Sequence, residues 1–204
     1  MASTASPYGF RAVNELGGLP YAGSTRQFLI DPAGYNTNIF NGSIVRINTS
    51  GYLNIVTTNG DDSTPFPAGT IGVFVGCSFV NAQGQTIYSQ YYPANTASVN
   101  GSAITAYVVD DDRAVFQVQA NGSMAQTTLG NNVFLANAQS TSTGSTTTGN
   151  SNIAVSSSSQ TGTAAFRIVG FANVPGFSTV GDAYTDLLVK FNPGYHSYSN
   201  AVGV

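Results

Sequence analysis

The sequence Ala114-Val115-Phe116-Gln117-Val118-Gln119-Ala120-Asn121-Gly122 decides the fold class. Its side chains alternate between two faces, with Phe116 and Val118 together on one of them, and this period of two is typical of a half-buried β-strand. The Asn-Gly pair that follows supplies the positive φ angles that a tight hairpin turn requires. We therefore expect a strand here, followed by a turn toward an antiparallel neighbour.

The same two signals recur along the chain. Further Asn-Gly pairs occur at 41–42, 59–60 and 100–101. Short runs rich in β-branched and aromatic residues lie at 26–30, 44–47, 52–56, 70–75, 86–92, 104–109, 165–171 and 184–191. About ten short strands separated by turn signals predict an all-β fold, either an antiparallel β-barrel or a β-sandwich.

One segment has the features of a short helix. Ser123 stands where a cap would precede residues 124–129, and Gly130 stands where a left-handed residue would end the helix. No other segment has a convincing helical period. We therefore expect at most one short helix.

The first 24 residues form a segment of different character. Gly and Pro interrupt them too often for a helix, yet they carry apolar side chains that gain by covering a surface. We predict an extended N-terminal arm over residues 1–24, followed by a single β domain over residues 25–204.

A second unusual segment is rich in Ser and Thr and runs from about residue 139 to 162. Composition alone is typical of a flexible linker. However, Ile153 and Val155 alternate with small residues at its centre. We interpret the segment as an exposed β-loop within the one domain.

Length and composition set the class of protein. The 204 residues suffice for one domain, and charged residues make up only 7% of them. Charge normally keeps protein surfaces apart, so such a chain is suited to life within an assembly. The net charge of −3 argues against nucleic acid as a partner, because nucleic-acid binders concentrate Lys and Arg.

Location and thiol chemistry are predicted from the absence of particular signals. The start at Met1 leads into no apolar run, so we expect synthesis in a host cytoplasm without export, and no membrane partner. Cys77 lies within an apolar run with no flanking cation, so we interpret it as a small buried side chain.

Few residues could support catalysis or bind a metal. His196 is the only histidine and no nucleophile motif accompanies it, so we interpret it as a packing or surface residue. Asp110, Asp111 and Asp112 form a weak candidate metal site, because the spaced ligands of a dedicated calcium loop are absent. Asp182 and Asp186 give a weak signal for glycoside hydrolysis. We predict no catalytic residues and no cofactor.

Segments along almost the whole chain resemble the head decoration, or cement, proteins of tailed bacteriophages. The segments that carry the resemblance are 7–11, 17–18 with 20–21, 38–45, 72–77, 91–94, 106–111, 116–120 and 187–192. The resemblance implies a β-rich body on the outer surface of an expanded capsid. It implies a bridge between coat subunits, a homo-oligomer and no enzymatic reaction.

These expectations combine into one hypothesis and two alternatives. The first is a virion cement protein, a dimer or trimer that binds the major capsid protein through its arm. The candidate contact residues are Tyr8, Phe10, Arg11, Leu19, Tyr21 and Arg26. The second is a phage fibre or host-receptor module that binds glycans through exposed tyrosines and the Ser/Thr-rich loop. The third, with the least support, is a small β hydrolase.

Overall fold

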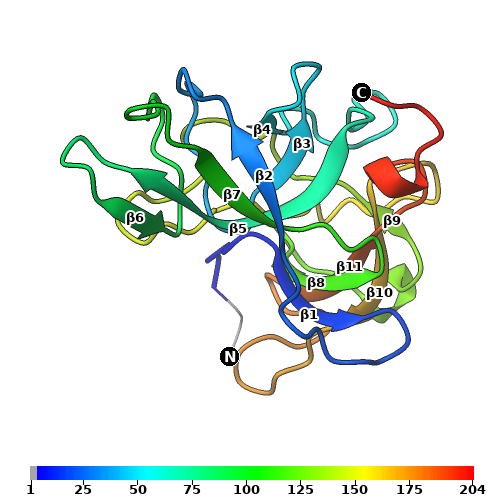
Figure 1. The fold of residues 1–204 in the computed structure, drawn as a ribbon. Helices are drawn as coiled ribbons and strands as arrows, with labels where there is room; N and C mark the ends of the chain where they lie inside the picture. The colour runs from blue at the N-terminus through cyan, green and yellow to red at the C-terminus, as the bar shows by residue number, and fades with distance from the viewer. Residues whose placement is uncertain (1–3) are drawn as a thin grey trace.

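The computed structural model describes residues 4–204, and the regular secondary structure of this part of the chain is almost entirely β-strand (Figure 1). The strands are β1 (Arg11–Glu15), β2 (Arg26–Ile30), β3 (Ile44–Ile47), β4 (Leu53–Ile55), β5 (Thr70–Val80), β6 (Thr86–Ser89), β7 (Ile104–Val109), β8 (Ala114–Gln119), β9 (Asn132–Val133), β10 (Phe166–Phe171) and β11 (Asp186–Phe191). Two single-turn 3-10 helices, η1 (Gln126–Thr128) and η2 (Ser197–Ser199), complete the described elements. The predicted all-β class is confirmed.

Two antiparallel sheets pack against each other as a sandwich. Sheet A has the order β1-β8-β11-β10-β9, and sheet B has the order β2-β7-β5-β3-β4, with β6 added beside the end of β5. Sheet B curls so that Cα atoms of its outer strands β2 and β4 approach within 8 Å of each other. The strand order does not pair β2 with β4, however, so the barrel alternative is not realised as a closed barrel.

The curl gives the molecule two hydrophobic clusters. The larger cluster lies between the sheets and contains Phe10, Phe116 and Phe166. The smaller cluster fills the concave side of sheet B and contains Phe74, Cys77 and Tyr92. Burial raises the pKa of the Cys77 thiol to about 12, in agreement with a thiol that packs rather than reacts.

The predicted arm does not extend away from the body. Residues Arg11–Glu15 form β1, which pairs with β8 at the edge of sheet A. The ring of Phe10 is 1% exposed and stacks on Phe166 with 4.8 Å between ring centroids. The prediction of a separate arm over residues 1–24 is therefore wrong for this stretch, because burying the Phe10 ring and pairing its strand outweigh an exposed extension.

The Ser/Thr-rich segment, predicted to be an exposed β-loop, is packed into the body at its centre. Its centre is buried, with Ile153 4% and Val155 0% exposed, and Val155 forms bridges to Ala120 and Leu135. At its start, the buried Gln139 amide accepts from the Ile44 N–H and donates to the Ile44 and Val56 carbonyls. Polar side chains therefore order a segment whose composition indicates disorder, because they satisfy buried backbone groups.

The candidate helix is reduced to the single turn η1. Gly130 has the predicted left-handed conformation, with φ +86°. Ser123 does not cap the turn, because its hydroxyl donates to the Gly181 carbonyl instead. Within residues 4–204, no helix is long and apolar enough to span a membrane.

The sheets are joined where residues 9–10 cross Gly42. The Phe10 N–H donates to the Gly42 carbonyl at 3.0 Å, and the Gly42 N–H donates to the Phe74 carbonyl of β5 at 2.8 Å. Gly42 has φ +91°, and a Cβ atom placed there would lie 2.9 Å from the Phe10 nitrogen. Backbone conformation and close approach both require glycine at this position.

We expect Gly42→Ala to lower the free energy of unfolding by at least about 3 kcal/mol, since it combines left-handed strain with a backbone clash. The matched control is Gly51→Ala, where φ is +81° but nothing lies within 4 Å; it should cost only about 1–2 kcal/mol from φ strain. Chemical denaturation measures both. Equal losses in the two variants would show that the crossing does not constrain the fold.

Candidate docking surface

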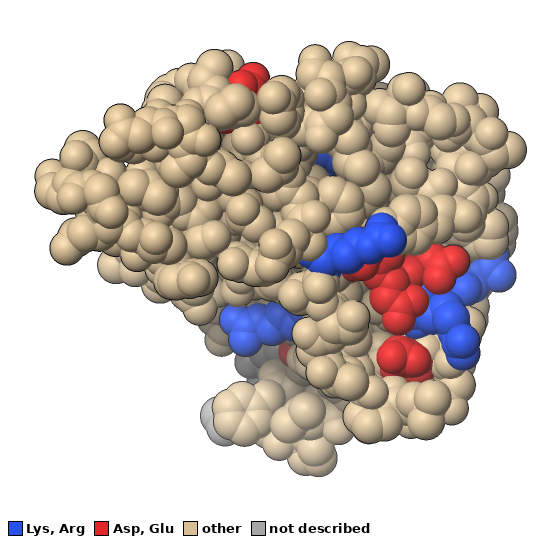
Figure 2. Space-filling view, in the orientation of Figure 1, with Lys and Arg blue, Asp and Glu red and all other residues tan. Residues whose placement is uncertain are grey.

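Charge is unevenly distributed over the molecule. No Asp, Glu, Lys or Arg occurs between residues 63 and 109, or between residues 114 and 166. In Figure 2 the charged side chains gather over one part of the visible face, while the lobe that carries β6 shows none. Covering the uncharged lobe with a partner therefore buries no charged group of this chain.

A row of neutral side chains crosses the convex face of sheet B. Strand register aligns Leu29 of β2 with Thr105 of β7, Thr105 with Ser78 of β5, and Ser78 with Tyr88 of β6. Aligned residues of neighbouring strands point to the same face. Leu29 is 50% and Tyr88 76% exposed, so large apolar side chains lie open at both ends of the row.

A hollow lies between this convex face and β1, and we call it the notch. It has a volume of about 450 Å³, and its lining includes Arg11, Ala12 and Tyr21 on the β1 side and Val75 and Val109 on the sheet B side. Figure 2 shows the outline of the molecule hollowed between the β6 lobe and the lower lobe. The notch and the neutral row together form the candidate docking surface.

The structure places the six contact residues predicted from the sequence in different environments. Phe10 is a core residue and is unavailable to a partner, so its assignment as a contact residue is wrong. Leu19 is 59% exposed in the turn that follows β1. Tyr21 is partly buried against the inter-sheet cluster, and its hydroxyl donates to the Ser24 carbonyl. Arg11 and Tyr21 line the notch.

Tyr8 and Arg11 lie against each other beside the notch. The Arg11 guanidinium lies over its ring, 5.1 Å from the centroid. Burial and the negative charge of Asp186 raise the pKa of the Tyr8 hydroxyl, and burial also raises the pKa of the Asp186 carboxyl. Tyr8 therefore remains neutral at physiological pH and cannot neutralise Arg11.

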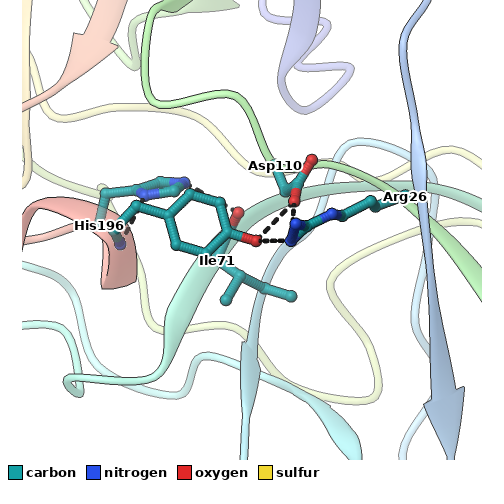
Figure 3. Close-up of polar contacts among 5 residues, drawn as sticks. Arg26, Ile71, Asp110 and His196 are labelled. Carbon is teal, nitrogen blue, oxygen red and sulfur yellow. Dashed lines mark hydrogen bonds and ion pairs between the residues drawn. The ribbon is translucent and has the colours of Figure 1, made fainter. Parts of the chain in front are cut away.

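Arg26 is engaged within the molecule instead of being free for a partner. Its Nη1 lies 3.1 Å from Asp110 Oδ2 and also donates to the Tyr198 hydroxyl, which in turn donates to Asp110 Oδ2 at 2.6 Å. Figure 3 shows Arg26 and Asp110 converging on this hydroxyl. The contact ties the start of β2 to the end of β7 and to the C-terminal turn η2.

The acidic candidates do not form a metal site. Asp110 is paired with Arg26, and Asp111 Oδ1 accepts the Arg113 N–H at 2.8 Å, which closes the turn before β8. Between residues 4 and 204, no three His, Cys, Asp or Glu side chains are grouped to hold a metal ion. The Asp182 carboxylate accepts from the Thr179 N–H and hydroxyl, and so serves a turn.

His196 is a packing residue, one of the two roles that its sequence context indicates. It is 1% exposed, and its ring meets Phe191 and Tyr198 edge to face. Nδ1 accepts the Tyr198 N–H at 3.3 Å, so Nε2, 2.9 Å from the Ile71 carbonyl, carries the proton (Figure 3). Burial lowers the pKa of His196, although the Ile71 carbonyl and the nearby aspartates act in the opposite direction.

Sequence reasoning did not single out three exposed apolar residues, Leu29, Tyr88 and Phe177. Leu29 was included only in a predicted strand, and Tyr88 only in a run of aromatic residues, although alternation with Phe28 and Ile87 could have assigned each a face. Phe177 is 78% exposed at the tip of the loop between β10 and β11, beside a Pro-Gly turn. An aromatic residue next to Pro-Gly was the available signal.

Comparisons with protein-family models, with curated proteins and with solved structures found no match.

We expect stability to decrease on acidification because of His196. Its pKa is about 6.5 in the unfolded chain and lower in the fold, so the unfolded state binds the proton first and gains stability as the pH falls below 6.5. Above about pH 6.5, the contribution of neutral His196 to the free energy of unfolding is fully present.

Urea unfolding of the wild type and His196→Asn at pH 7.5 and pH 5.5 isolates this effect, because the other titrating groups, including Asp186, are common to both. The wild type should lose more stability between the two pH values than the variant. Equal losses would show that His196 does not titrate with unfolding.

Proposed function

We propose that the protein is a structural component of a tailed-bacteriophage head, which binds the outer surface of the assembled capsid and bridges coat subunits. The observation that carries the proposal is the docking surface, where exposed Leu29 and Tyr88 lie in an uncharged row beside the notch. Such a surface gains free energy when a partner covers it. The resemblance to decoration proteins points in the same direction.

A binding protein of this kind needs no catalytic residue. Whatever binds only the assembled shell opposes its disassembly by mass action. Even a micromolar contact is worth about 8 kcal/mol per site, and the contribution repeats at every site of the lattice. We accordingly propose the major capsid protein as the partner, self-association as a dimer or trimer, and the outer face of the virion as the location.

One observation favours a second candidate, a host-binding module for neutral glycans. Tyr88 is 76% exposed on a hairpin that carries no charge, and aromatic rings with nearby hydroxyls suit sugar faces. The Ser/Thr-rich segment supports this candidate less than its composition suggests, because its centre is packed into the body.

We expect Tyr88→Asp and Leu29→Asp each to weaken binding to capsids of the parent phage by at least about 30-fold, because each puts a charge where an exposed apolar side chain would be covered. Val202→Asp is the control, because Val202 is also exposed, at 66%, but lies by the C-terminus, away from β6 (Figure 1). Co-sedimentation with capsids stripped of the protein, after a thermal melt to confirm folding, measures the effect.

Two results would contradict the proposal. One is wild-type binding by both Asp variants. The other is the absence of the protein from purified particles, measured by mass spectrometry against the coat protein. A copy number comparable to that of the coat protein would support a decorating role, whereas a dozen or so copies would indicate a tail or portal position. Retention on a neutral glycan array that Tyr88→Asp abolishes would favour the host-binding candidate.

A further inference from the structure

The notch has a strand edge as one of its walls. β1 is the outer strand of sheet A, paired on one side with β8. Its other side turns toward sheet B, because the Phe10 N–H reaches the Gly42 carbonyl and Gly42 itself bonds to Phe74 of β5. The wall opposite β1 is the convex face of sheet B at Val75 and Val109.

The register of β1 shows which backbone groups face the notch. Leu16 N–H bonds to the Arg113 carbonyl, so Arg113, just before β8, and residues 115 and 117 of β8 direct their backbone groups toward β1. Arg11 is aligned with Gln117, and Arg11 therefore bonds to β8. Ala12, next in the chain, directs its N–H and C=O away from β8, on the same side as the Phe10 N–H.

The open edge is short and bounded at both ends. Phe10 N–H is occupied by Gly42, and the Val13 carbonyl, after the bulge in β1, accepts the Tyr21 N–H at 3.4 Å. Between them, the Ala12 N–H and C=O have the geometry to pair with an added extended segment. Unpaired strand edges are where proteins recruit extended peptides.

The notch carries a positive charge, that of Arg11, at its rim. Within residues 4–204 the single ion pair is Arg26 with Asp110. Arg11 therefore has no carboxylate partner there, although it lines both the notch and an adjoining hollow formed with Ser6, Tyr8 and Gln117. The neutral Tyr8 ring holds the guanidinium in place from one side. A guanidinium held at the rim of an uncharged hollow is complementary to a carboxylate.

We propose that the notch binds an extended peptide segment of a partner protein, which pairs with Ala12 as an added strand and places an acidic side chain at Arg11. Apolar side chains of the segment pack on the partly buried Val75 and Tyr21. The identification of this partner as the coat protein rests on the proposed function, but the peptide chemistry does not.

The test is selection of a displayed library of random nine-residue peptides on the purified full-length protein. We expect enriched peptides to combine β-branched residues with one acidic position. Arg11→Gln should weaken their binding at least about 10-fold, whereas Arg167→Gln should change it less than about twofold. Arg167 is an exposed cation on β10 that bonds to Asn132 and is not part of the notch.

A second pair of variants tests the backbone contact. Ala12→Pro removes the N–H that faces the notch and no bond to β8, so we expect at least about a 10-fold loss of peptide binding with the fold retained. Ala12→Ser keeps the N–H and should bind like the wild type. In ¹⁵N-resolved NMR titrations with a selected peptide, the Ala12 amide should shift downfield.

The inference is overturned if no peptide is enriched, if enriched peptides lack an acidic position, or if Arg11→Gln and Ala12→Pro bind as tightly as the wild type. Capsid binding is measured separately on the same proteins. Capsid binding without peptide binding would reject the strand-addition site and leave the proposed function standing. Peptide binding without capsid binding would reject the proposed function and leave the strand-addition site standing.

Discussion

The contact of residues 9–10 with Gly42 is the constraint on which the rest of the structure depends. Gly9 and Gly42 both have positive φ angles, and a Cβ on either would press against the backbone of the other segment. This close approach brings the Phe10 ring into the space between the sheets, where it meets Phe116 and Phe166. It also fixes β1 at the edge of sheet A, facing sheet B, and therefore creates the notch.

In a chain with so few charges, side-chain amides satisfy buried polar groups that the backbone pairing of the sheets leaves over. The Gln139 side chain bonds to Ile44 and Val56 in the interior, and the buried Asn192 amide donates to the Asn132 side chain and to the Ala164 carbonyl. These neutral groups lose less on burial than ions would. The same choice of residues leaves an outer surface that is polar but weakly charged.

The local patterns in the sequence were enough to predict the β class, but not the pairing of the strands. Alternation identified strands such as β8 correctly. The Asn-Gly pairs do mark turns, and Asn100 and Gly101 both have positive φ, yet all four lie between strands that are not paired with each other. The tight hairpins use Asn48 and Asn81 instead, each of which accepts two backbone N–H groups of its own turn. An Asn at the first turn position with a Gly three residues later, as in Asn48 with Gly51 and Asn81 with Gly84, could have predicted both turns from the sequence.

The candidate site was predictable in part for the same reason. Arg11, Leu19 and Tyr21 were chosen as apolar or cationic residues in an irregular segment, and they do line the notch or lie exposed in the turn after β1. Phe10 was misassigned because nothing local distinguishes an aromatic ring that covers a foreign surface from one that enters its own core. That distinction depends on β8, a hundred residues further along the chain.

The docking surface favours association with a partner, whereas an open strand edge must be protected from unselective pairing. A weakly charged protein with open strand edges tends to aggregate, because edges recruit other strands and little charge opposes their approach. Here the turn after β1 returns to occupy the Glu15 N–H and the Val13 carbonyl, so only the groups at Ala12 stay open, recessed beneath sheet B. A recessed edge accepts a thin extended segment but excludes the flat edge of another folded sheet. The geometry of this edge thus favours docking of one extended segment over unselective pairing with the edges of other folded sheets.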